Sequence, residues 1–295
     1  MQIKKLLFHT HFKERSFDAL ETLLDLKDAG LSEIILTYII DRKEVGFVPY
    51  GGYLKEEENR IREAAKIHFE KWQQILTGHS ISSQIVIEKG LPNLTILKIA
   101  QEKMADMIVT GRKKRTLLEK VYVGSHILDL LRRSPVPILM HKYQVEYEAD
   151  DRTHNRINNQ IFKTPMVATD WSNPSSNALD AMGALKGVAA KIQVAHVIDE
   201  KMVKHHSEKE INRLKQESQK RLDDYCNRLK KMELLGESYL AMGKTTAEII
   251  RLSREYKATM IVMGRTGKDW FEEYWLGGVS HKVAELSELP VLLIP

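Results

Sequence analysis

The chain has 295 residues, of which 43% are hydrophobic and 29% are charged, so it is globular and not an intrinsically disordered chain. Its formal net charge of +5 comes from basic residues mixed with acids, which does not favour nucleic-acid binding. A single cysteine, Cys226, excludes an internal disulfide framework and suits a reducing compartment. No apolar run reaches the ~18 residues of a membrane span, and the N-terminus is too short in apolar residues for a signal peptide. We therefore expect a cytoplasmic protein without a membrane partner.

The first short strand carries His9 and His11 on one face and Thr10 on the other. Two histidines at this spacing do not make a metal site on their own. No CxxC or HExxH pattern accompanies them. The sequence therefore predicts no metal centre.

The chain contains an internal repeat with a spacing of 153 residues, first seen between Gly90 and Gly243. Further pairs at this spacing are Ala105 and Ala258, Ile108-Val109 and Ile261-Val262, Gly111-Arg112 and Gly264-Arg265, Gly124 and Gly277, Ser134 and Ser287, and Pro137 and Pro290. Near the start of each repeat the spacing is 159, as between Thr10 and Thr169. The first repeat thus has about six extra residues, which we place at 45–53 around the turn signal Gly51-Gly52.

Each repeat alternates short apolar runs with amphipathic stretches. In the second repeat we expect strands at 166–169, 192–197, 238–242, 260–263 and 291–294, and a long helix at 207–235. Apolar strands separated by helices are typical of parallel sheets with right-handed crossovers. The sequence predicts an α/β fold of two tandem doubly wound domains, each with roughly five parallel strands.

The two domains are expected at 1–142 and 163–295, joined by a linker at 143–162 that begins with a polar stretch. We expect the last strands of the domains, 136–140 and 291–294, to pair across a pseudo-twofold axis. The domains would then pack as an intramolecular pseudo-dimer. Whether the chain also forms a homo-oligomer stays open.

A glycine-rich loop follows the predicted strand 260–263. Gly264 and Gly267 are followed, after nine residues, by Gly277 and Gly278, and Ser280 comes next but one. Glycines after a buried strand let backbone N–H groups approach phosphate oxygens without a Cβ in the way. The serine hydroxyl and the N-terminus of the following helix also favour an anion. This pattern predicts a nucleotide-phosphate site.

A second part of the site is expected at Asp170, at the end of the first strand of the second repeat. In open α/β sheets, ligands bind at the carboxyl ends of the strands, near the point where the strand order reverses. The carboxylate there accepts hydrogen bonds from a base or a sugar. The alternative is that Asp170 caps the helix that follows it.

With these features the chain resembles the universal stress protein family in its tandem two-domain form. The resemblance rests on Val-Ala-Thr-Asp at 167–170, on Val-Ala-His-Val-Ile-Asp at 194–199, on the spacing Gly-x-x-Gly-x9-Gly-Ser/Thr of the glycine loop, and on the last strand. It implies binding of an adenine nucleotide, ATP or AMP, with or without Mg²⁺. The residues it places around the nucleotide are Ala168, Thr169, Asp170, Val197, Met263, Gly264, Arg265, Gly267, Lys268, Gly277, Gly278, Val279 and Ser280.

The resemblance implies that Asp170 contacts the adenosine and that the backbone of Val197 lines the adenine pocket. The glycines and Ser280 would contact the ribose and phosphates, with Arg265 and Lys268 nearby. The family prefers Ser or Thr where this chain has Gly278. The missing hydroxyl donor is worth ~1 kcal/mol, so phosphate binding is expected to be weaker but to survive.

The first repeat matches the motif less well. His11 stands where the second repeat has Asp170, and Lys114 stands where it has Gly267. A lysine can hold a phosphate as a point charge, but its Cβ obstructs a close backbone approach. We expect the first repeat to be a structural partner without nucleotide, the alternative being that it binds another or weaker anion.

Three functions stay open. The first is a cytoplasmic stress-response regulator or sensor that binds an adenine nucleotide in the second repeat and acts through conformation or a protein partner. The second is a slow ATPase or phosphotransfer enzyme, for which the sequence offers no clear general base or Walker-type Mg²⁺ site and no assigned catalytic residue. The third is a nucleotide-free interaction module. The glycine loop favours the first.

Overall fold

The computed structural model of the chain describes residues 2–12, 16–41, 55–111, 125–142, 144–149, 152–265 and 278–295. For 125–128, 144–149 and 152–157 it describes the backbone alone. The insertion expected at 45–53 lies outside these residues. Among the residues described, no helix is long and apolar enough to cross a membrane.

One ten-stranded sheet runs through the molecule. Its strands are β1 (Lys5–His9), β2 (Glu33–Asp41), β3 (Ser82–Gly90), β4 (Met107–Gly111), β5 (Ile138–His141), β8 (Pro165–Thr169), β9 (Ile192–Asp199), β10 (Gly236–Gly243), β11 (Met260–Gly264) and β12 (Val291–Ile294). Their order is β10-β9-β8-β11-β12-β5-β4-β1-β2-β3. Five strands come from each half, and neighbours within a half are parallel. The expected pair of doubly wound domains is thus confirmed.

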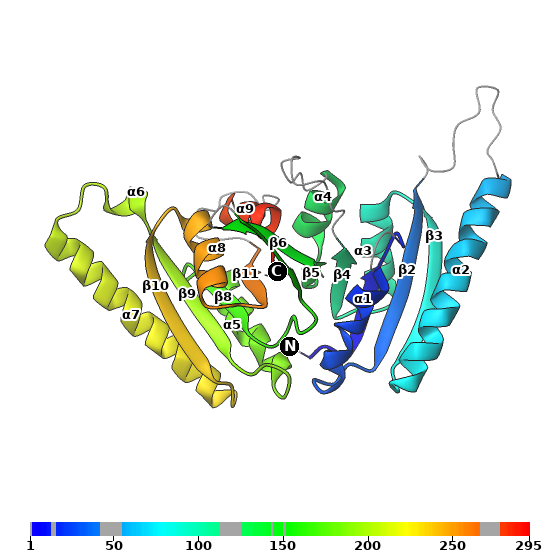
Figure 1. Ribbon diagram of the computed structural model, residues 1–295, viewed down its shortest axis with the longest axis horizontal. Coiled ribbons are helices and arrows are strands. Elements are labelled where there is room, and N and C mark those ends of the chain that lie inside the picture. Colours follow the sequence, from blue (N-terminus) through cyan, green and yellow to red (C-terminus); the bar gives the residue numbers. More distant parts are fainter. Residues whose placement is uncertain are drawn as a thin grey trace, which may run out of the picture.

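Helices cover both faces of this sheet (Figure 1). They are α1 (Ser16–Glu21), α2 (Lys55–Gly78), α3 (Pro92–Glu102), α4 (Ser125–Arg133), α5 (Asn173–Ala181), α6 (Glu200–Val203), α7 (Glu208–Lys231), α8 (Thr245–Glu255) and α9 (Gly278–Leu286). One apolar cluster lies under α1, α2, α5 and α7, and a second lies under α3, α4, α8 and α9. Each cluster contains residues of both halves, so each core is continuous across the molecule.

The central strand pair joins the halves as expected from the sequence. β5 and β12 are antiparallel, and Leu139 lies opposite Leu292. Two further contacts cross the junction: Arg265 Nη1 donates to the carbonyl oxygen of Ser134 at 2.5 Å, and Lys142 Nζ donates to that of Ser287. Figure 1 shows the result, with α7 and α2 at opposite ends of the molecule and both chain termini near the middle.

The connection between the halves has more structure than the predicted linker. Strands β6 (Gln144–Ala149) and β7 (Arg152–Ile157) form an antiparallel hairpin. After it, Asn158 Nδ2 donates to the carbonyl oxygen of Thr259 at 2.8 Å. Ile161 and Phe162 are buried in the core. The end of the connection is therefore part of the C-terminal half.

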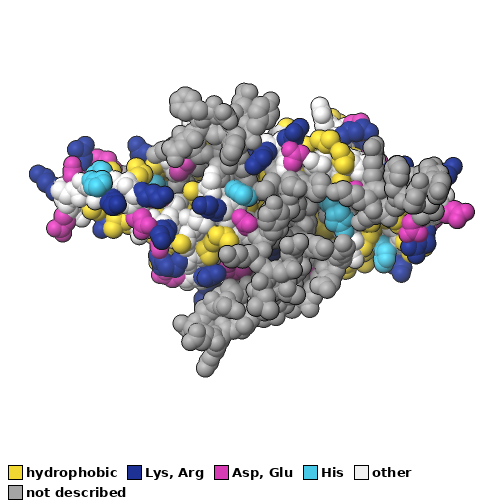
Figure 2. All heavy atoms as spheres, turned by 90° about the horizontal axis from the view of Figure 1, so that it is seen from above, with side chains coloured by type: hydrophobic (Ala, Val, Ile, Leu, Met, Phe, Trp, Pro, Cys, Tyr) yellow, Lys and Arg dark blue, Asp and Glu magenta, His cyan; other side chains and the backbone are white. Residues whose placement is uncertain are grey.

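All five strands expected in the second repeat are present, and β8, β9, β10 and β11 extend one to three residues beyond the predicted bounds. The long helix expected at 207–235 begins just after Ser207, which caps it, and ends at Lys231. Seen from above, basic and acidic side chains are interspersed over the described surface (Figure 2). This matches the mixed charge pattern of the sequence.

Candidate functional site

The carboxyl ends of β8, β9 and β11 meet where the strand order of the C-terminal half reverses. From β8 the chain moves to β9 and β10 on one side, and then to β11 and β12 on the other. Thr169 lies opposite His196, and Ala168 lies opposite Met263. A crevice at such a reversal is the usual ligand position in an open α/β sheet. The structure thus brings the strand-end residues predicted for the site to one edge of the sheet.

Three of these strand-end residues have buried apolar side chains that belong to the core beneath the predicted site. Ala168, Val197 and Met263 are buried and belong to the cluster under α8 and α9, against which Val279 also packs. Their side chains offer a ligand no hydrogen bond. Any polar contact from these positions would come from the backbone, as predicted for Val197.

Asp170 is half-buried and holds the start of α5. Its Oδ1 accepts hydrogen bonds from the backbone N–H of Ser172 at 3.0 Å and from the Ser172 hydroxyl at 2.5 Å. Ser172 is the N-cap of α5 and accepts from the N–H of Ser175 at 3.4 Å. Ser172 is thus the capping residue, and Asp170 positions it without capping α5 itself, while the nucleotide contact of Asp170 stays a prediction.

Gly264 and Gly278 differ in the space around them. A Cβ on Gly264 would lie 2.6 Å from the carbonyl carbon of Pro174, so α5 packs against this position only because it has no side chain. A Cβ on Gly278 would meet no described atom within 4 Å. Gly264 therefore has a packing reason for being glycine, whereas no described residue crowds Gly278, the first residue of α9.

Ser280 and Arg265 fasten the two ends of the glycine loop together. The buried Ser280 hydroxyl donates to the carbonyl oxygen of Arg265 at 2.8 Å, and the Arg265 N–H donates to Ile294 O at 2.7 Å. The Arg265 guanidinium is directed to Ser134 in the other half, and burial lowers its pKa. Both residues lie at the predicted site, but the hydrogen bonds described here are made to other residues of the protein and stabilise its fold.

Three predicted site residues, Gly267, Lys268 and Gly277, lie outside the described residues, as does Lys114 of the first repeat. Within the part of the chain that is described, no three His, Cys, Asp or Glu side chains come together as a candidate metal site.

The structure adds an aromatic stack that sequence reasoning missed. Trp171 has a left-handed backbone with φ of 68°, and its N–H donates to Thr169 Oγ1 at 3.1 Å. Its ring lies 4.4 Å from that of His196, and the Arg221 guanidinium lies over it at 5.7 Å. His196 Nδ1 is 2.8 Å from the carbonyl oxygen of Thr169, so this nitrogen carries the proton. Because Arg221 is far away in the sequence, no local pattern could reveal the stack.

Comparison with known proteins places this architecture in a family. The profile described as the universal stress protein family matches residues 2–142 and 162–295. Universal stress protein YxiE of Bacillus subtilis (strain 168) is 31% identical over 147 residues, which cover 45% of this chain and 99% of YxiE. Universal stress protein MJ0577 of Methanocaldococcus jannaschii is 28% identical over 153 residues, which cover 47% of this chain and 94% of MJ0577.

Among solved structures, a universal stress protein from Archaeoglobus fulgidus DSM 4304 has the same overall fold. It aligns with a TM-score of 0.69 at 20% sequence identity, and the alignment covers 99% of this chain and 96% of that one. Two family matches, one in each half, therefore coincide with the two five-stranded parts of the sheet. The chain belongs to the universal stress protein family, with one family domain in each half.

Proposed function

We propose that the C-terminal half binds an adenine nucleotide, ATP or AMP, and that the bound form acts as a regulator or sensor in a stress response. The observation that carries the proposal is the convergence of Asp170, Gly264 and the start of α9 at the reversal point of the sheet. An adenosine would lie at the ends of β8 and β9. Its phosphates would lie at the end of β11 and the start of α9.

The start of α9 supports the phosphate end of this arrangement. The helix has nine residues, and its N-terminal N–H groups together with its dipole favour an anion. Gly278 opens this end, because no described atom lies within 4 Å of where its Cβ would be. A phosphate can therefore approach the backbone closely.

Titration calorimetry with ATP, AMP and GTP on the full chain tests the proposal. We expect saturable binding of the adenine nucleotides and weaker binding of GTP. Gly278→Ser should strengthen ATP binding by about fivefold, because it adds a hydroxyl donor worth ~1 kcal/mol at the start of α9. Gly278→Ala is the matched control, since it adds the Cβ, which meets no described atom within 4 Å, without the hydroxyl.

A second variant separates the two roles of Asp170. Asp170→Asn keeps an oxygen that can accept from Ser172, as the carboxylate does now, but removes the negative charge. Weaker ATP binding with unchanged stability would assign the carboxylate to the nucleotide. Absence of binding by any adenine nucleotide to the unmodified chain would refute the proposal. Chromatography of ATP incubated with the protein and Mg²⁺ would show whether the nucleotide stays intact.

The regulatory part of the proposal is supported by Arg265. Its backbone directly follows β11 at the predicted site, while its guanidinium donates to Ser134 O at the end of α4 in the other half. A nucleotide bound at the end of β11 would lie next to the backbone of Arg265 and would act on this contact. The C-terminal site is therefore connected physically to the N-terminal half.

A further inference from the structure

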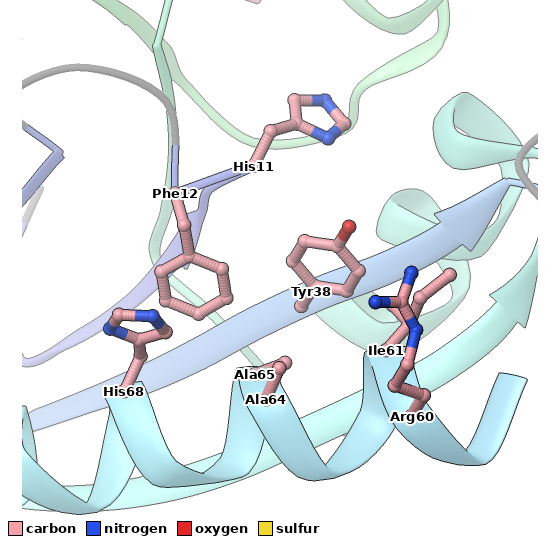
Figure 3. A pocket seen from close by; sticks show the side chains of 8 residues that line it. All are labelled: His11, Phe12, Tyr38, Arg60, Ile61, Ala64, Ala65 and His68. Atoms are coloured by element: carbon pink, nitrogen blue, oxygen red, sulfur yellow. The ribbon is translucent and has the colours of Figure 1, made fainter. Parts of the chain in front are cut away.

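A cavity of about 290 Å³ lies in the N-terminal half (Figure 3). Its walls come from the two residues His11 and Phe12 just after β1, from β2 and from the part of α2 between Arg60 and His68. The residues that line it are His11, Phe12, Tyr38, Arg60, Ile61, Ala64, Ala65 and His68. The cavity is an open surface hollow, since His11, Arg60, Ala64 and His68 are exposed, and its volume is large enough for one or two fused rings.

The cavity shares one position with the N-terminal copy of the proposed nucleotide site, because His11 is the counterpart of Asp170, but it differs from that copy in the face of the sheet that it uses. Along β2 and β9, residues 158 positions apart correspond, so Tyr38 matches His196 and Ile39 matches Val197. Ile39 and Val197 both face the cluster under α3, α4, α8 and α9. Tyr38 instead belongs to the cluster on the opposite face, under α2. The cavity therefore lies on the other side of the sheet from the residues expected to support an adenine.

Aromatic rings form one wall of the cavity and are held in place. The Phe12 ring stacks on that of Tyr38, with centroids 5.4 Å apart and planes at 17°. The His68 ring also stacks on the Phe12 ring, with centroids 5.0 Å apart and planes at 28°. Phe69 and Trp72 pack against Phe12 at 4.8 and 5.3 Å. Rings fixed in this way are preorganised for an aromatic ligand.

The floor is made of small residues on α2. Figure 3 shows Ala64 and Ala65 between His68 and Arg60 along the helix, below the ring of Tyr38. The corresponding position of Ala64 in α7, 153 residues later, is Glu217, and Trp171 stands in place of Phe12. Larger side chains thus occupy these positions in the C-terminal half. The open floor is a property of the N-terminal half.

The charge around the cavity favours an anion. Among the described residues that line it, none is acidic and one is an arginine. The Arg60 side chain is 76% exposed and bonds Glu57 through Nε and Nη2, while Nη1 has no acceptor among the described residues. The imidazoles of His11 and His68 add N–H donors. A carboxylate at this rim would meet these N–H donors, while the charge of Glu57 beside Arg60 is already paired with that arginine.

We propose that this cavity binds a small planar aromatic anion, with its ring against Phe12 and Tyr38 and its carboxylate near Arg60. The proposal does not depend on nucleotide binding in the C-terminal half. Calorimetric titration of naphthoate into the full chain is its test. We expect naphthoate to bind with one site per chain, more tightly than the neutral naphthalenemethanol and the cationic naphthylmethylamine, and more tightly than the non-aromatic cyclohexanecarboxylate.

Two variants locate the site. Ala64→Leu fills the floor at an exposed helical position that tolerates leucine, and should weaken naphthoate binding by about tenfold or more. Arg60→Gln should weaken naphthoate binding by about threefold, as expected for one exposed charge pair, and leave naphthalenemethanol unaffected. Arg213→Gln is the matched control, because Arg213 is the corresponding arginine of α7, is 79% exposed and also pairs with a glutamate. It should change nothing.

Three results would overturn the proposal: no naphthoate binding, unchanged binding by Ala64→Leu, or competition between naphthoate and ATP for a single site. Circular dichroism of each variant shows that it is folded. If ATP fails to bind but naphthoate binds with the expected pattern, the nucleotide proposal alone fails. If ATP binds and naphthoate does not, the cavity proposal alone fails.

Discussion

Phe12 and Trp171 follow the first strand of their halves with left-handed backbones, at φ of 52° and 68°. This conformation costs about 1–2 kcal/mol in a residue that is not glycine. In each half a threonine two residues earlier, Thr10 or Thr169, accepts a hydrogen bond from the N–H of the aromatic residue. Packing of the ring and this bond offset the strain. Both halves thus have the same turn, stabilised by the same hydrogen bond, although the aromatic residue is phenylalanine in one and tryptophan in the other.

Gly264 and Gly111 occupy corresponding positions, 153 residues apart, but differ in surroundings. Gly264→Ala would place its Cβ 2.6–2.8 Å from atoms of Pro174, so we expect a loss of about 1–3 kcal/mol in the free energy of unfolding. Gly111→Ala meets no described atom within 4 Å and should change stability by less than about 0.5 kcal/mol. Urea denaturation followed by circular dichroism measures both. Equal losses would contradict the packing role of Gly264.

Two buried histidines make the stability of the fold depend on pH. Burial, and then the charge of His11, lowers the pKa of His9 from 6.5 to about 3, and burial lowers that of His141 to about 4. His9 Nε2 has no hydrogen-bond partner among the described residues, while His141 Nε2 lies 2.7 Å from Thr22 Oγ1. Neither ring has an acidic partner among its described contacts. Both are therefore neutral in the folded protein.

Because the folded pKa values are below 6.5, the unfolded chain takes up protons that the folded chain does not. The stabilisation is complete above about pH 6.5 and falls as the pH drops toward 4. Between pH 7.5 and 5.5 the two histidines should reduce the free energy of unfolding by about 2–3 kcal/mol. Urea denaturation at both pH values measures the loss.

The control for this effect is a double variant, His9→Ala with His141→Ile. These are the residues that the C-terminal half has at the corresponding positions, Ala168 and Ile294. The pH dependence should shrink in the variant, whatever its stability at pH 7.5. An unchanged difference between the two pH values would show that other groups cause it.

At the scale of elements, α2 and α7 bury matching positions although their residues differ. Their buried residues, 153 positions apart in each pair, are Ala65 and Ser218, Phe69 and Leu222, Trp72 and Tyr225, and Leu76 and Leu229. The start of α7 is fixed by a reciprocal cap: Ser207 Oγ accepts from the N–H of Glu210, and Glu210 Oε2 accepts from the N–H of Ser207 at 2.7 Å. The Ser207 hydroxyl, which donates to Glu210 Oε2 at 2.6 Å, and then the Ser207 N–H lower the pKa of Glu210.

Ser207→Ala removes the side-chain half of this cap. We expect a loss of about 1 kcal/mol in the free energy of unfolding, because one N–H at the helix start loses its acceptor. Ser207→Thr keeps a hydroxyl acceptor and should lose much less. Urea midpoints of the two variants measure the difference, and equal midpoints would show that the cap contributes nothing to stability.

Strands could be predicted from the sequence because buried parallel strands are continuous apolar runs, as at 260–263 and 291–294. The hairpin β6–β7 could not, because its residues are polar and lack the apolar run by which the other strands were found. The sequence also located the reversal point through Asp170 and the glycine loop. It could not show that Gly264 packs against Pro174 or that Arg265 reaches Ser134, because these contacts join distant segments.

At the scale of the whole molecule, the halves share two cores and a central strand pair. Leu139 and Leu292 face each other across the junction and are 0% and 2% exposed. An isolated half would expose the edge of β5 or β12, an unpaired strand edge with apolar residues. The junction is therefore part of the fold of each half.

Hydrogen exchange should report whether this junction transmits nucleotide binding. ATP at about 100 times its dissociation constant stabilises the bound state by about 2.7 kcal/mol. If the Arg265–Ser134 contact transmits part of this stabilisation to the N-terminal half, the backbone amides in the last turn of α4 should exchange more slowly with ATP than without it. In Arg265→Gln the ATP effect on α4 should be lost. Arg228→Gln, far from α4 and bonded to Asp180 within the C-terminal half, is the control. If ATP slows hydrogen exchange only in the C-terminal half of the unmodified chain, the junction does not transmit nucleotide binding.

The single polypeptide has a consequence for symmetry. In a dimer of two identical subunits, every substitution appears twice, at both sites at once. Here the two partners in the β5–β12 junction are encoded separately, so each can change alone while its neighbour keeps its own chemistry. The tether also keeps the partners together at any dilution, since their association is intramolecular. One molecule can therefore carry two unlike ligand sites in a fixed one-to-one ratio.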